Sequence, residues 1–139
     1  MSTTSRKSEI ISKASQLFKE KGYSAVTVRD IAQAMEMKAA SLYNHIDSKQ
    51  EILSILILDL ARDFTDGMHQ VQQMKNSPLQ KIEALIELHI DITVNQSEAL
   101  AALNNDWMHL PENEVVEFVA MRESYEENFR NIIKEGISL

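Results

Sequence analysis

The stretch Thr27–Ile46, TVRDIAQAMEMKAASLYNHI, has the pattern of two short helices joined by a tight turn. Thr27 can cap the first helix, and Asp30, three residues later, can reach back to complete a capping box. Four apolar side chains then recur at helical spacing on one face: Val28, Ile31, Ala32 and Met35. Glu36, Met37 and Lys38 follow them, and we expect the chain to turn there before the second helix begins.

The second helix of this stretch would direct Leu42 and Ile46 inward. Its other side chains are small, polar or aromatic: Ala39, Ser41, Tyr43, Asn44 and His45. Small residues let a helix approach base edges in the major groove, and hydroxyl, amide and imidazole groups can hydrogen bond to phosphates and bases. This pattern is typical of a helix-turn-helix recognition helix. The alternative is an ordinary helical hairpin with a solvated Tyr and His.

Residues 10–53, a longer part of the chain, contain three further informative segments: ASQLFKEKGYSAVTVRDIA, SLYNHI and SKQEIL. In this order and spacing they resemble the N-terminal DNA-binding domain of the TetR (tetracycline-repressor type) family of bacterial regulators. Three positions depart from the usual family pattern. Glu36 replaces a turn glycine, Lys38 replaces a capping Ser or Thr, and Ala40 replaces a frequent glycine. A positive φ at Glu36 would cost roughly 1 kcal/mol, and the departures bear on the operator sequence more than on the fold.

Helix N-termini favour phosphate, so Thr27 and Arg29 at the start of the first helix are predicted phosphate contacts. A plain cap and a surface ion pair are the alternatives for these two residues. The resemblance implies that Lys49 also touches phosphate, and a solvated surface lysine is the alternative. The complete predicted DNA-binding set is Thr27, Arg29, Lys38, Ala39, Ser41, Tyr43, Asn44, His45 and Lys49.

Composition and charge favour an all-α protein with a basic head. The 139 residues are 44% hydrophobic and include only 3 Gly and 2 Pro. The net charge of −7 divides into +3 for residues 1–50 and −10 for residues 51–139, as expected of a protein that presents one face to phosphate. The absence of Cys excludes disulfides and thiol chemistry and fits a cytoplasmic protein. The polar start and short apolar runs indicate neither a signal peptide nor a membrane span.

The helical pattern divides the chain into two parts. Residues 1–47 form a predicted three-helix, helix-turn-helix DNA-binding domain, in which residues 1–7 are a flexible arm or a disordered tail and the first helix runs from about Ser8 to Lys21. Residues 48–139 form a predicted α-helical domain for ligand binding and dimerisation, with four helices. The resemblance implies that this domain is incomplete at Leu139, because family members usually carry two further helices that build the dimer interface.

Four further helix signals are visible in the second domain. Ser48, Ser77 and Ser97 are expected caps, the first two in capping boxes with Glu51 and Gln80. The helix after Ser77 carries a predicted inner stripe of Ile82, Leu85, Ile86, His89, Ile92 and Thr93. Pro111 is expected to end the helix after Ser97, and Gly136 the one that begins near Asn113.

A small-molecule pocket is predicted among the last three helices, where sparse polar groups interrupt apolar ones. Its predicted residues are Leu85, His89, Thr93, Leu103, Asn104, Trp107, Met121 and Tyr125. A fully packed core is the alternative from the residues alone, and the resemblance favours the pocket because the family usually binds an inducer there. The segment DWMHLPENEVVEFVAMRESYEENFRNIIKEG resembles the subgroup that responds to fatty acids or acyl-CoA thioesters.

Other chemistry finds no support in the sequence. The four His residues lack partners at metal-binding spacing, and no nucleophile, phosphate-loop or zinc-protease motif is present. We therefore expect no metal, no cofactor and no enzymatic activity. The predicted function is a ligand-responsive transcriptional regulator, most simply a repressor, that binds a palindromic double-stranded DNA operator as a homodimer. A helical protein–protein adaptor that does not bind DNA is the alternative.

Overall fold

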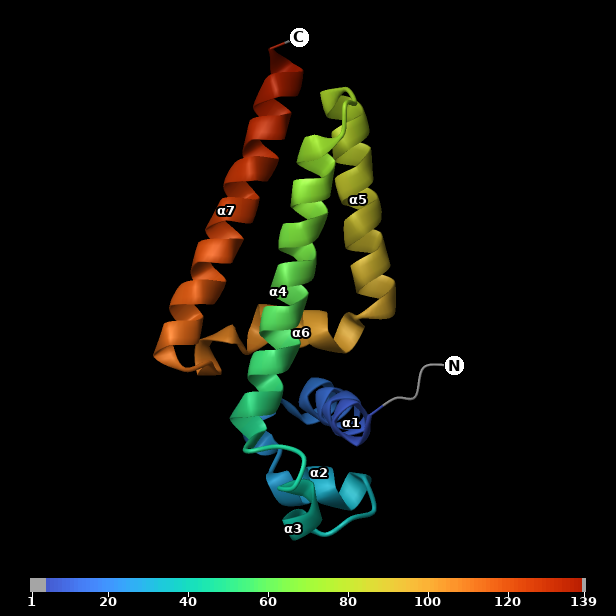
Figure 1. The fold of residues 1–139 in the computed structure, drawn as a ribbon, viewed down its shortest axis with the longest axis vertical. Helices are drawn as coiled ribbons and strands as arrows, with labels where there is room; N and C mark the ends of the chain where they lie inside the picture. The colour runs from blue at the N-terminus through green and yellow to red at the C-terminus, as the bar shows by residue number, and fades with distance from the viewer. Residues whose placement is uncertain (1–4, 139) are drawn as a thin grey trace.

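The computed structural model describes residues 5–138, and in this range every regular element is helical (Figure 1). The seven α-helices are α1 (Arg6–Lys21), α2 (Val28–Ala34), α3 (Ala39–Leu42), α4 (Lys49–Gln73), α5 (Pro78–Asn95), α6 (Ser97–Asn105) and α7 (Glu112–Ile137). Two short 3₁₀ helices connect them, η1 (Tyr23–Ala25) and η2 (Trp107–His109). The prediction of an all-α fold is confirmed.

The helices α1, α2 and α3 gather at one end of α4 and form a head, residues 6–46 (Figure 1). Its core consists of apolar side chains that are at most 3% exposed: Ile10, Ala14, Phe18, Val26, Ile31, Ala32, Leu42 and Ile46. The capping box of α2 is present, with Thr27 and Asp30 bonded to each other's backbone N–H groups at 3.1 and 2.9 Å. The local sequence signals of the head are therefore confirmed.

The first helix begins two residues earlier than expected, because the Ser5 side chain caps it by accepting a hydrogen bond from the N–H of Ser8. Arg6 and Lys7 belong to this helix rather than to an arm. Arg6 pairs with Glu9 at 2.7 Å, and Lys7 lies 3.4 Å from the carboxylate of Glu51. The rest of the predicted arm, residues 1–4, lies outside the described residues.

The long helix α4 connects the head to the rest of the chain, which we call the body (Figure 1). In Figure 1, α5 and α7 flank α4 along its far half, and α6 crosses it near the head. Side chains on several faces of the head-proximal half of α4 are therefore buried: Ile52, Leu53, Ile57, Leu58, Leu60 and Ala61. This half of α4 is therefore packed on more than one side.

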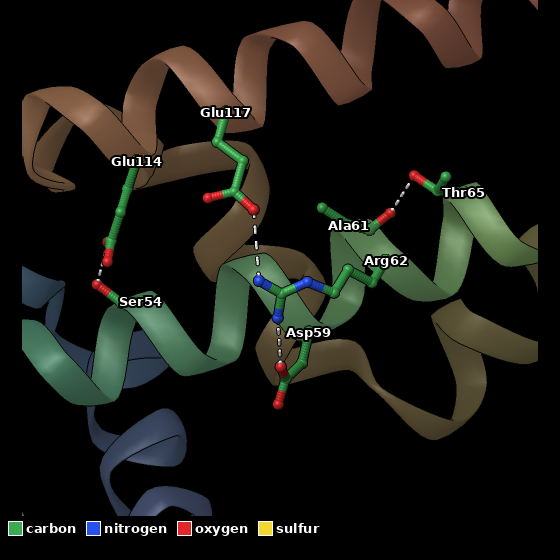
Figure 2. A network of polar contacts seen from close by, with 7 residues as sticks. All are labelled: Ser54, Asp59, Ala61, Arg62, Thr65, Glu114 and Glu117. Carbon is green, nitrogen blue, oxygen red and sulfur yellow. Dashed lines mark hydrogen bonds and ion pairs between the residues drawn. The ribbon is translucent and has the colours of Figure 1, made fainter.

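Polar contacts between α4 and α7 supplement the apolar packing (Figure 2). The Ser54 hydroxyl donates to the carboxylate of Glu114. The guanidinium of Arg62 lies 3.4 Å from Glu117 on α7 and 3.2 Å from Asp59 on its own helix. These ion pairs are about half exposed, so each contributes little to stability.

Two glycines mark places where helices of the body approach closely. A Cβ atom on Gly67 of α4 would lie 2.5 Å from Cδ2 of Leu88 on α5. A Cβ on Gly136 would lie 3.3 Å from Cβ of Pro78, at the start of α5. The prediction that Gly136 ends the last helix is wrong, since α7 continues through it to Ile137. The glycine allows close packing there instead.

Three further predictions about the body need correction. Ser48 caps α4, but Glu51 accepts from the N–H of Asp47 rather than completing a box. Gln96, not Ser97, occupies the cap position of α6, and the Ser97 hydroxyl contacts Lys19 and Glu98 instead. The helix α6 also ends at Asn105, well before Pro111.

The predicted inner stripe of α5 is only partly buried. Leu85 and Ile92 lie in the core, at 0% and 4% exposure. Ile86 is 51% exposed, and His89 and Thr93 are exposed as well. The outward face of α5 also carries Ile90 and Val94, which the helical pattern did not single out.

The turn between α2 and α3 forces Glu36 into a left-handed backbone conformation, with φ of 55°. The N–H of Met37 donates to the carbonyl of Ala32, and the N–H of Glu36 donates to the carbonyl of Gln33. This pair of bonds is the Schellman pattern, whose left-handed residue is usually glycine. The turn predicted at Glu36, Met37 and Lys38 is thus confirmed, and Glu36 adopts the positive φ whose cost is roughly 1 kcal/mol.

Replacing Glu36 with glycine is expected to raise the free energy of unfolding by about 1 kcal/mol, because glycine has no Cβ to oppose positive φ. The melting temperature should rise by roughly 4 °C in a thermal scan followed by circular dichroism. Glu36→Ala is the matched control, since it removes the same carboxylate but keeps a Cβ. Equal stabilisation by both variants would assign the effect to the lost charge instead of the backbone.

Candidate DNA-binding face and effector cavity

The outward side of α3, together with the turn residues 43–45 that follow it, forms a polar surface at the end of the head. The helix was expected to continue to Ile46, but α3 ends at Leu42, and the N–H groups of Asn44 and His45 donate to carbonyls three residues earlier. Leu42 and Ile46 are 0% and 2% exposed and hold the segment against the core. The intervening side chains point to solvent, and Tyr43 is 53% exposed. Among the described residues, the side chains of Ser41, Tyr43, Asn44 and His45 make no internal hydrogen bond. Their polar groups are therefore free to bind another molecule.

The start of α3 differs in chemistry from a usual capped helix. Lys38 is its N-cap residue and provides no side-chain hydrogen bond to the first turn. Ala39 is half-buried, while Lys38 and Ala40 are exposed. A helix that starts with the small side chains of Ala39 and Ala40 can approach a nucleic acid closely. Lys38 adds a positive charge at the start of this helix.

The start of α2 lies in the same head and presents two of the predicted phosphate contacts. Arg29 and Thr27 are both exposed. The hydrogen bonds from Thr27 hold the pKa of the Asp30 carboxyl below its usual range, so the capping box stays ionised at neutral pH. The start of α2 is thus held by the capping box, and Arg29 belongs to the first turn of this helix.

Lys49 has a different environment from the other predicted DNA contacts. Its Nζ donates to the backbone carbonyl of Tyr23 at 2.9 Å and lies 4.0 Å from the centre of the Tyr23 ring. The side chain is half-buried. The structure therefore separates Lys49 from the eight other residues of the predicted set, which lie in α2, in α3 or beside them.

A cavity of about 310 Å³ lies between α4, α5, α6 and α7. Five of the eight predicted pocket residues line it: His89, Leu103, Asn104, Met121 and Tyr125. The lining residues that sequence reasoning missed are Ala61, Phe64, Thr65, Phe118, Arg122 and Glu126. Phe64, Phe118 and Arg122 come from two different helices, and only tertiary packing shows that they face a shared space.

The other three predicted pocket residues lie outside this cavity. Leu85 is fully buried with Met68, Val71 and Ile132 in a second apolar cluster. Thr93 lies on the exposed side of α5 and donates to the carbonyl of His89. Trp107 belongs to η2, where its ring stacks on Phe118 at 5.8 Å between centroids.

The polar anchor of the cavity is the contact between His89 and Tyr125, whose Nε2 and Oη atoms are 2.6 Å apart. Burial lowers the pKa of the His89 imidazole and raises the pKa of Tyr125 to about 12. Both groups are therefore neutral at pH 7, with Tyr125 able to donate to the imidazole. The ring of Phe64 lies 5.1 Å from His89 and 5.6 Å from Tyr125, so the anchor is set in an aromatic wall.

Other candidate sites in the described residues are less suited to a ligand. A groove of about 490 Å³ along α4 and α7 is open to solvent and lined largely by charged and polar side chains. Within residues 5–138, no three His, Asp or Glu side chains gather in a way that could hold a metal ion. In the same range, no helix is long and apolar enough to pass through a bilayer.

Two family models match the chain, one on each side of the middle of α4. Residues 10–55 match the model described as "Bacterial regulatory proteins, tetR family". Residues 75–138 match the model described as "Tetracyclin repressor-like, C-terminal domain". The first match includes the candidate DNA-binding face, and the second includes α5, α6 and α7.

Individual relatives are similar to the chain in sequence and in fold. The HTH-type transcriptional repressor KstR2 of Mycolicibacterium smegmatis is 32% identical over 107 residues, which are 68% of this chain and 50% of that protein. The structure of the ketosteroid transcriptional regulator KstR2 of Mycobacterium tuberculosis superposes with a TM-score of 0.91 at 20% identity, covering 99% of this chain and 70% of that one. The crystal structure of AibR in complex with isovaleryl coenzyme A and operator DNA superposes with a TM-score of 0.79 at 21% identity. This superposition covers 94% of this chain and 71% of the AibR chain. The chain thus spans about half the length of the first of these relatives.

Proposed function

The chain belongs to the TetR family of bacterial regulatory proteins, and on this premise we propose that it is a DNA-binding transcriptional repressor released from its operator by a small hydrophobic effector. The observation that carries the proposal is the exposed polar side of α3, whose hydrogen-bonding groups have no internal partner in the described residues. A surface of small, polar and aromatic side chains on a head of net charge +3 suits the major groove.

The proposed contacts fall into two classes. Phosphate contacts are assigned to Thr27, Arg29 and Lys38, and base-edge contacts to Ser41 and Asn44. Tyr43 and His45, which follow α3, are assigned contacts with the DNA backbone through the hydroxyl and the imidazole. Ala39 is assigned the role of allowing close approach.

Two copies of the chain are proposed to bind one palindromic operator. A homodimer would place its two α3 segments in successive major grooves, about 34–36 Å apart. In this proposal residues 1–47 are the DNA-binding domain, and residues 48–139 belong to the effector-binding and dimerisation domain.

The proposed effector is an apolar molecule with a polar group, such as a fatty acid or an acyl-CoA thioester. Support comes from the cavity, where Phe64, Leu103, Phe118 and Met121 surround the neutral His89–Tyr125 pair. AibR, which shares the fold, was crystallised with an acyl-CoA and operator DNA. An effector releases DNA only if it binds the DNA-incompetent conformation more tightly.

The proposal is tested by titrating a fluorescent random duplex and following anisotropy at about 50 mM and about 200 mM salt. A protein that neutralises several phosphates should lose roughly three orders of magnitude in affinity over this range. Tyr43→Ala should weaken binding about tenfold per head, because a hydrogen bond to a charged group contributes about 1.5–3 kcal/mol. The loss should be similar for specific and random duplexes, as expected of a phosphate contact.

Val116→Ala is the control, since Val116 is 66% exposed on α7 and far along the chain from the head. It should leave both affinity and salt dependence unchanged. A helical adaptor that does not bind DNA would show no salt-dependent binding in the unmodified protein. That result would overturn the proposed function.

A further inference from the structure

Tyr23 and Lys49 stand on either side of the helix-turn-helix segment. Tyr23 opens η1 just before α2, and Lys49 opens α4 just after α3. The Lys49 ammonium donates to the Tyr23 carbonyl at 2.9 Å and lies 4.0 Å from the centre of its ring. One side chain therefore joins the two ends of the segment that carries α2 and α3.

This position of Lys49 is not explained by helix electrostatics. A cation in the first turn of a helix is unfavourable because the N-terminus already carries partial positive charge. The carbonyl and ring of Tyr23 compensate, since both present negative partial charge to the ammonium. The ring itself is 8% exposed and packs edge-on against Phe18, at 5.1 Å between centroids. Lys49 is thus held on a fixed aromatic platform.

The body also contacts the ring of Tyr23. The imidazole of His109, in η2, lies 5.2 Å from the Tyr23 ring centre at an interplanar angle of 30°. The carbonyl of His109 accepts a hydrogen bond from Gln50 Nε2 at 3.1 Å. Gln50 follows Lys49 directly, so η2 contacts Tyr23 through the His109 ring and the start of α4 through this hydrogen bond.

The segment that carries His109 begins at the cavity. Leu103 and Asn104 line the cavity from the last turn of α6. Trp107 then stacks on Phe118, which also lines it. A ligand that displaces these side chains would act on η2, and through His109 on Tyr23.

We propose that Lys49 is a positioning residue that holds the two ends of the helix-turn-helix segment together through its contacts with Tyr23, an interaction that we call the clasp. His109 is the residue through which the body controls the position of the clasp. The inference rests on the proposed function, and it gives Lys49 a role other than the phosphate contact implied by the family resemblance. An ammonium has three N–H donors, and the Tyr23 carbonyl accepts from one of them. The other N–H groups could still donate to a phosphate, so the experiment must distinguish a phosphate contact from the positioning role.

The first test needs no DNA, so it is independent of the proposed function. Amide hydrogen exchange is measured on the free protein and on Lys49→Met, which keeps the apolar stem and removes the charge. We expect exchange in residues 39–46 to accelerate about tenfold, while α5 and α7 keep their unmodified rates as an internal control. His109→Ala should accelerate the same segment to a smaller degree. Unchanged exchange in both variants would overturn the proposal.

His109→Ala also decides the matter if Lys49→Met loses its fold, because this variant leaves Lys49 and Tyr23 in place. Exchange that accelerates equally in α5, α7 and residues 39–46 of His109→Ala would reject a local clasp. Acceleration confined to the head supports it.

The second test measures the slope of log affinity against log salt concentration for a duplex. Lys49→Met should bind about tenfold more weakly with an unchanged slope, because no phosphate contact is lost. Lys38→Met is the matched lysine variant and should reduce the slope by about 1 per head. A slope that falls equally for Lys49→Met would make Lys49 a phosphate contact and overturn its assignment as a positioning residue. If the unmodified protein binds no duplex, the proposed function fails while the exchange result still stands.

Discussion

Replacing Ser41 with glutamate is expected to reduce the affinity for duplex DNA by about a hundredfold or more, since placing like charges together costs several kcal/mol. Ser41 is exposed on α3 and directly precedes the buried Leu42, so the substitution leaves the core side chains unchanged. Its side chain would bring a carboxylate to the surface that we assign to the major groove. Fluorescence anisotropy with a labelled duplex at fixed salt gives the ratio of affinities directly.

The matched control for Ser41→Glu is Gln72→Glu, which changes the net charge equally. Gln72 is exposed near the far end of α4. The control should weaken binding only slightly, because screening limits its effect over a distance beyond the Debye length. Equal losses in both variants would show that net charge, and not the face of α3, governs binding.

Truncating Leu42 to alanine should have the largest effect on stability, lowering the free energy of unfolding by about 3 kcal/mol. Leu42 is 0% exposed and belongs to the core cluster that includes Ile31, Ile46 and Ile52. Its removal leaves a cavity directly beneath α3, a helix of only four residues that has little stability of its own. Urea denaturation followed by circular dichroism measures the loss.

Val94→Ala provides the control for Leu42→Ala, because Val94 is 72% exposed on α5 and its truncation should change stability very little. Binding of DNA by Leu42→Ala should fall with the folded fraction. A loss of stability no larger than that of the control would mean that Leu42 does not anchor α3.

The head could be predicted from sequence because its signals are local. Thr27 and Asp30 lie three residues apart, so their capping box depends on no distant contact. The spacing of Leu42 and Ile46 likewise indicates which side of residues 39–46 is buried, and both are buried. The turn at Glu36 was predicted as well, although only the structure shows that its φ is positive. Interactions between residues a few positions apart can be predicted from the local sequence.

The body was harder to predict because its details depend on which helices meet. Gly136 resembled a helix stop, yet it serves the approach of α7 to Pro78. Trp107 had the right spacing for α6, but the helix ends earlier and the ring stacks on Phe118. Leu85 and Thr93 share a predicted stripe with His89, although one is buried in another cluster and the other is exposed. Hydrophobic periodicity predicts which face of a helix is apolar, but it does not predict which other helix packs against that face.

Lys49 has neighbours that the family resemblance did not indicate. Its place in the family pattern implies a phosphate contact, and in the structure its neighbours are the carbonyl and ring of Tyr23. Nothing in the sequence signals this contact, because the two residues are 26 positions apart and the ring is positioned by the fold.

Gly67 allows the side chain of Leu88 to pack directly against the backbone of α4. An added methyl group would lie 2.5 Å from Cδ2 of Leu88, so the end of that side chain would have to rotate away. The absence of a side chain at this position therefore lets α5 lie nearer to α4 than it otherwise could.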